Sequence, residues 1–94
     1  MSLQILDAKP EGTNKAFVLL GSNQPAELTG LQAKQAVLKI AATQCGLARA
    51  GISGSYSLGY LTKEGEMTPD VEYLAGKLPP GGLHVHRYDI QGSL

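Results

Sequence analysis

The stretch from Thr29 to Cys45 constrains the fold most, because it predicts one helix with a single broad apolar side. At 100° per residue its apolar residues fall on one stripe, and its polar residues lie opposite. A helix of this kind must bury its stripe against another layer of structure. The predicted stripe comprises Leu31, Val37, Leu38, Ala41, Ala42 and Cys45.

Signals at both ends frame this helix. Thr29 followed three residues later by Gln32 predicts a capping box, whereas Asn23 with Pro25 close behind offers an earlier start. Gly46 directly after the last stripe residue predicts a left-handed stop. We therefore expect a helix over 29–45, with its first turn open to two interpretations.

Two residues within the angular range of the stripe carry reactive groups. Lys34 falls within the angular range of the stripe, and we expect its stem to pass the helix end so that the amine reaches water. Cys45 lies on the stripe itself, which favours a place in the core over a role as a nucleophile.

Strand-like segments lie on both sides of the helical pattern. Residues 3–8 and 15–21 are apolar and are separated by Lys9-Pro10-Glu11-Gly12, which predicts a turn and a hairpin. The unbroken apolar run in 15–21 is typical of a central strand covered on both faces. These segments supply the second layer that the helix needs.

The segment ISGSYSLGYL, residues 52–61, alternates large and small side chains. A period of two predicts a strand with one core face and one face of very small residues. That second face holds Ser53, Ser55 and Ser57. It is either solvated or a place where another backbone or a flat ligand comes close.

The remaining segments complete a two-layer α+β domain over residues 1–94. Thr68-Pro69-Asp70 predicts a short second helix to about residue 75, stopped by Gly76, and a strand at 71–75 is the competing interpretation. The last strand covers 83–90 after a Pro- and Gly-rich stretch. We expect a mostly antiparallel four-stranded sheet with one main helix on one face.

The last strand contains both histidines of the chain. His84, His86, Tyr88 and Ile90 share one strand face, so the sequence predicts either a polar, half-exposed face or an interface. Zinc takes three or four protein ligands, and two histidines supply only two. We expect no bound metal, and a metal-dependent enzyme using His84 and His86 is the second alternative for function.

Charge and cysteine content exclude several classes of function. Eight basic and eight acidic residues cancel, which argues against nucleic acid and anionic membranes as partners. The lone Cys45 fits a reducing compartment, so we expect a cytoplasmic protein. Neither the serines nor the histidines match a catalytic motif, and no phosphate-binding glycine pattern occurs, so we expect no catalytic residues and no cofactor.

Residues 16–57 resemble the N-terminal part of the hydroxymethyl-dihydropterin pyrophosphokinase family. The resemblance lies in AFVLLGSN, a following helix, and GISGSYS. It implies that Gly21, Ser22 and Asn23 form the floor of a pterin pocket. The family's magnesium-binding Asp-x-Asp pair has no counterpart here, so the resemblance implies ligand binding without kinase activity.

These patterns together favour a non-catalytic protein-interaction module that forms homo-oligomers. The features behind this prediction are the Ser/Gly strand face, the tyrosines and an uneven charge distribution, with basic residues in 31–49 and acidic residues in 64–72. The first alternative is a domain that binds a small pterin- or nucleotide-like ligand through residues 21–23.

Overall fold

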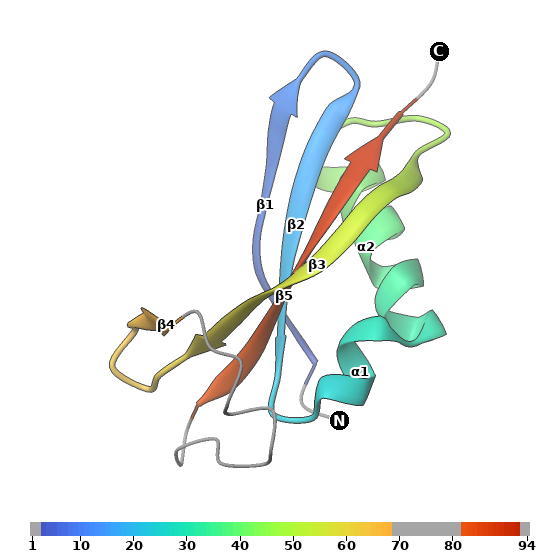
Figure 1. The fold of residues 1–94 in the computed structure, drawn as a ribbon. Helices are drawn as coiled ribbons and strands as arrows, with labels where there is room; N and C mark the ends of the chain where they lie inside the picture. Colours follow the sequence, from blue (N-terminus) through green and yellow to red (C-terminus); the bar gives the residue numbers. More distant parts are fainter. Residues whose placement is uncertain (1–2, 69–81, 93–94) are drawn as a thin grey trace.

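The computed structural model of the chain describes residues 3–68 and 82–92, which form an antiparallel sheet with helices on one face (Figure 1). The sheet order is β1-β2-β5-β3-β4. This arrangement confirms the predicted α+β class. The elements are β1 (Gln4–Gly12), β2 (Lys15–Ser22), α1 (Pro25–Thr29), α2 (Leu31–Gln44), β3 (Gly51–Leu61), β4 (Met67–Thr68) and β5 (Leu83–Gln91).

The predicted hairpin of the first two strands is confirmed, but its turn lies later than expected. β1 continues through Pro10 to Gly12, and the chain reverses at Thr13 and Asn14, where Asn14 has a φ of 59°. Asparagine is one of the few residues that accept this left-handed backbone at low cost. Pro10 fits within β1 because β1 is an edge strand, where the missing N–H group of proline costs no hydrogen bond.

The predicted capping box of Thr29 is wrong, because the helical segment is divided at Gly30. The earlier start is the one observed: Pro25 opens α1, and Thr29 is its last residue. Gly30 precedes α2 without a side-chain cap. At the other end the prediction holds, since Gly46 has a φ of 69° and the Leu47 N–H group bonds to the Ala41 carbonyl at 3.1 Å.

The core lies between the two helices and the sheet face that they cover. The side of α2 that meets the sheet is centred on Ala33, Val37 and Ala41, spaced by four residues along one helix face. Leu31 was predicted to belong to the buried stripe, but it is 70% exposed at the corner between α1 and α2. The buried core residues are Ala16, Val18, Leu20, Leu28, Ala33, Val37, Ala41, Leu47, Tyr88 and Ile90.

Other predictions for the helix and the sheet are met in part. Cys45 follows the last residue of α2 as its C-cap and is half-buried against the core, and Lys34 is exposed. β2 is an internal strand as predicted, although Phe17 and Leu19, on its face away from the helices, are only half-buried. The predicted second helix at 69–75, or the strand in its place, lies outside the described residues. Within residues 3–68 and 82–92, no helix is long and apolar enough to cross a membrane.

Candidate functional site

β3 interrupts its regular alternation twice. Ile52 lies opposite Ile90 while Gly54 lies opposite Asp89, so Ser53 is an extra residue on β3. A second extra residue, Leu58, stands before Gly59 in the same way. Each β-bulge changes which face the following side chains occupy. Glycines inside a strand pattern are the signal that could have predicted these bulges.

The serines of β3 therefore do not share one small face, and this prediction is wrong. Ser55 lies opposite Tyr88 and Ser57 opposite His86, on the face of the sheet that carries the helices. Ser53 sits in a bulge, where its hydroxyl donates to the Asp89 carbonyl at 3.2 Å. All three serines are nonetheless exposed, although Ile52 of the same strand packs against the core under α2.

The large side chain that β3 presents to solvent is Tyr56. It lies opposite Arg87, on the face away from the helices, and is 47% exposed. Gly54 lies on this same face, opposite Asp89. A large and a very small residue therefore alternate along the exposed part of this strand.

The outer side of Gly51–Tyr56, which we call the β3 edge, faces away from β5. Among the described residues the neighbouring strand β4 pairs with Tyr60 and Leu61 only, so no described strand lies along the β3 edge. Exposed strand edges are templates for pairing with another chain unless charge or proline blocks them. Residues 51–61 contain no charged residue and no proline.

The opposite edge of the sheet is protected. β1 carries Pro10 and three charged residues, and it is bulged at two places. The charged residues are Asp7, Lys9 and Glu11. Charges, proline and bulges are the devices that natural proteins use to prevent edge-to-edge pairing. Of these three devices, β3 has only the bulges. The two edges of the sheet therefore differ in their protection against pairing with another chain.

The charge opposite Tyr56 in the pairing of β3 with β5 is compensated within the chain. Arg87 bonds to Asp89 at 2.8 Å and to Glu11 at 2.5 Å, and its guanidinium lies 4.5 Å from the centre of the Phe17 ring. The hydrogen bond to Asp89 is the main reason that the pKa of Arg87 is raised. The positive charge of Arg87, on the face beside the β3 edge, is therefore compensated.

Most of the histidine face of β5 is buried, which corrects the predicted half-exposed face: His84 and Tyr88 are buried, and His86 is half-buried. β5 is the middle strand of the sheet, and the face of His84, His86 and Tyr88 is the one that the helices cover. His84 is 5% exposed and Tyr88 1% exposed, and the Tyr88 hydroxyl donates to the Leu28 carbonyl in α1. A period of two shows which residues share a face but not which face is covered.

Burial changes the acid–base properties of both histidines. It lowers the pKa of His84 and of His86, because the charged imidazolium loses hydration. The His86 ring lies 5.0 Å from the Tyr88 ring, and its Nε2 atom is buried without a hydrogen-bond partner among the described residues. In the part of the chain that the structure describes, no group of three His, Cys, Asp or Glu side chains could hold a metal ion.

The turn at Gly21–Asn23 is used for packing and for starting α1. Gly21 is buried, and a Cβ atom there would lie 2.9 Å from Leu6. The Ser22 hydroxyl, fully buried, donates to the Glu27 carboxylate at 2.5 Å and accepts from the Gln24 N–H group at 3.0 Å. Asn23 alone of the three is exposed.

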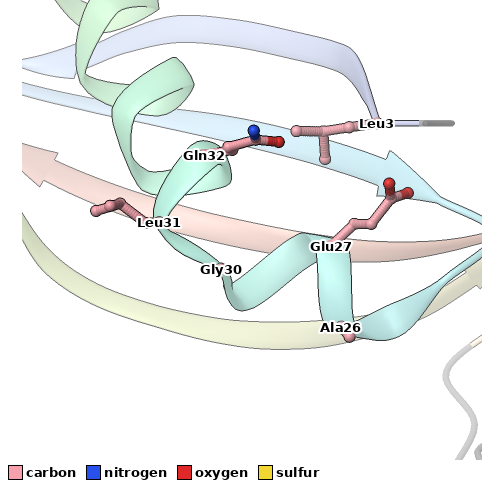
Figure 2. A pocket seen from close by; sticks show the side chains of 6 residues that line it. All are labelled: Leu3, Ala26, Glu27, Gly30, Leu31 and Gln32. Atoms are coloured by element: carbon pink, nitrogen blue, oxygen red, sulfur yellow. The ribbon is translucent and has the colours of Figure 1, made fainter.

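A shallow hollow lies beside this turn, at the corner between α1 and α2. Its volume is about 320 Å³, and Figure 2 shows Leu3 facing the side chains of Glu27 and Gln32 across it. The lining is largely apolar, with one carboxylate. The residues that line it are Leu3, Ala26, Glu27, Gly30, Leu31 and Gln32. Sequence patterns gave no indication of Glu27 as part of this hollow, because the hollow is formed by the break at Gly30.

Comparisons with models of known protein families, with curated proteins and with solved structures find no match for the chain.

Proposed function

We propose that the chain is a non-catalytic protein-interaction module that forms homo-oligomers by pairing copies along the β3 edge. The observation that carries this proposal is the contrast between the two edges of the sheet: β1 holds proline and three charged residues, whereas residues 51–61 hold none. An edge without such protection is the surface on which a second strand adds by backbone hydrogen bonds.

The bulges of β3 set the extent of this pairing. They occur at Ser53 and Leu58, so the regular part of the β3 edge is Gly54–Tyr56 with its immediate flanks. Backbone hydrogen bonds over so short a stretch must be supplemented by side chains, and Tyr56 is the large exposed side chain at its centre. We therefore expect reversible association of modest affinity.

Electrostatics supports association between copies of this chain. The formal net charge is zero, and a protein close to zero net charge lacks the self-repulsion that keeps copies apart. The ion pairs of Arg87 leave no isolated cation there beside Tyr56. The single cysteine supports placing this module in a reducing compartment such as the cytoplasm.

A charge placed on the β3 edge tests the proposal. Tyr56→Lys removes an aromatic contact from the proposed interface. It also requires each of the two copies to desolvate an ammonium group when they associate. We expect the association constant measured by sedimentation velocity to fall about tenfold or more, which corresponds to about 1.4 kcal/mol or more.

The matched control is Ile5→Lys, which adds the same charge at a similarly exposed residue on the protected edge. Ile5 is 40% exposed on β1, compared with 47% for Tyr56 on β3. We expect Ile5→Lys to leave the association constant unchanged. Equal losses from both substitutions, or a loss from Ile5→Lys alone, would place the contact elsewhere than on the β3 edge.

A second candidate function is the binding of a small pterin- or nucleotide-like ligand. The observation in its favour is the hollow of about 320 Å³ beside Glu27, which reaches the lower end of the size range of ligand pockets, about 300–1,000 Å³. Its carboxylate could accept hydrogen bonds from the amino and ring N–H groups of a pterin. Gly21 and Ser22 are buried, so such a ligand would rest against Glu27 instead.

Thermal denaturation with added pterins and nucleotides tests this second candidate. A ligand present at 100 times its Kd should add about 2.7 kcal/mol to the free energy of unfolding. The shift should disappear in Glu27→Gln and persist in Glu64→Gln, an exposed carboxylate remote from the lining of the hollow. A shift that both variants retain would remove the hollow as the binding site.

A further inference from the structure

The strand that forms the β3 edge has nearly the same pattern of side chains in both directions about Ser55. Residues 51–59 read GISGSYSLG, and reversed they read GLSYSGSIG. When two copies of this strand pair antiparallel about Ser55, glycine lies opposite glycine, isoleucine opposite leucine, and serine opposite serine. The one unlike pair joins the smallest residue, Gly54, with the largest, Tyr56.

This symmetry matters because two copies related by a two-fold axis present the same surface to each other. In such an interface residue i contacts residue j, and residue j contacts residue i. An antiparallel strand that pairs with its own copy therefore has to match its own reversed sequence. A strand that binds a different protein is under no such requirement.

The central pairs of this arrangement are complementary in size and polarity. Ser55 would face Ser55 of the second copy, and serine pairs across strands can bond through their hydroxyls. Gly54 and Tyr56 lie on the same face in this structure, opposite Asp89 and Arg87. Each tyrosine would therefore cover the glycine of the other copy, as aromatic side chains do when they stabilise glycine at a strand edge.

We propose that two copies of this chain form a closed dimer in which their β3 edges pair antiparallel, with Ser55 on the two-fold axis. The inference rests on the proposed function and specifies its partner, symmetry and register. The axis runs perpendicular to the joined sheets, so that the helices of both copies lie on the same side. Because the interface is self-complementary, it is satisfied by two copies and does not continue into a filament.

Disulfide formation between single-cysteine variants tests the register, in a Cys45→Ala background that removes the natural thiol. Directly opposed antiparallel residues have Cα atoms about 4.5–5.5 Å apart, within the range that a disulfide accepts, about 4.4–6.8 Å. We expect Ser55→Cys to form a covalent dimer readily under mild oxidation. The side chain of Ser55 is exposed, so this substitution should leave the fold intact.

Ser53→Cys is the matched control, since it lies two residues away on the same strand and is equally a polar, exposed residue. In the proposed register the two copies of Ser53 are offset by four residues, about 13 Å, which is too far for a disulfide. Ser53→Cys alone should therefore form covalent dimers at least about tenfold more slowly than Ser55→Cys. A mixture of Ser53→Cys with Ser57→Cys should form them.

Sedimentation of the reduced Cys45→Ala protein separates failure of the register from failure of the proposed function. A non-covalent dimer in which Ser55→Cys does not cross-link, or in which Ser53→Cys cross-links as fast, would overturn the register and leave self-association standing. A protein that sediments only as a monomer would overturn self-association itself and the dimer with it. Larger open-ended species would overturn the closed symmetry.

Discussion

Replacing Leu20 with alanine is expected to lower the free energy of unfolding by about 2.7–5 kcal/mol. Leu20 lies on β2 with none of its surface exposed, and it opposes His86 on β5 and Ile5 on β1. Alanine removes apolar surface from the core and leaves a cavity that the neighbouring strands and α2 can close only in part. Urea denaturation monitored by circular dichroism measures this loss.

Leu31→Ala is the matched control for this prediction, because it makes the same chemical change at a residue of opposite exposure. Leu31 is 70% exposed, so its replacement should change the free energy of unfolding by no more than about 0.5 kcal/mol. Similar losses of unfolding free energy at both positions would mean that Leu31 is buried against the sheet, as the stripe predicted from the sequence requires. Both measurements are best made on the Tyr56→Lys variant, so that association does not contribute.

Acidification is expected to destabilise the fold through His84, which is buried, and His86, which is half-buried. Burial lowers the pKa of His84 and of His86 in the folded state, whereas in the unfolded chain both titrate near pH 6.5. Below about pH 6.5 the unfolded chain therefore binds protons that the folded chain does not yet bind. Stability falls as the pH falls, with a slope of at most about 1.4 kcal/mol per pH unit for each histidine.

Urea denaturation between pH 7.5 and 5.5 measures this slope, above the range in which most carboxylates titrate. His84→Gln and His86→Gln remove one titrating group each, so each single variant should show a shallower slope and the double variant should lose most of it. A wild-type slope that the double variant retains would assign the effect to other groups. A stability that rises on acidification would contradict the lowered pKa values of both histidines.

Much of the architecture could be predicted from sequence patterns of short range. The main helix, observed as α2 within the predicted range 29–45, its stop at Gly46 and the four long strands follow from periodicity and from glycine and proline signals. The errors arise where partners distant in sequence decide the outcome. The bulges at Ser53 and Leu58 depend on the register against β5. The break at Gly30 is a local exception, because the capping signal at Thr29 predicted one continuous helix where α1 ends and α2 begins.

The histidine face illustrates the same limit. The sequence places His84, His86 and Tyr88 on one face correctly, but their burial follows from β5 being the middle strand under the helices. Strand order is a property of the whole chain. The β3 edge could not be predicted for the same reason. The absence of charged residues in 51–61 favours pairing with another chain only if this segment lies at an edge, and the strand order is what shows that it does.

Native mass spectrometry of the unmodified chain over a series of concentrations tests self-association through the β3 edge most directly. We predict a dimer that grows at the expense of the monomer as the concentration rises, and that is much weaker in Tyr56→Lys than in Ile5→Lys. A chain that stays monomeric at every concentration, or that dimerises equally well after Tyr56→Lys, would contradict the account.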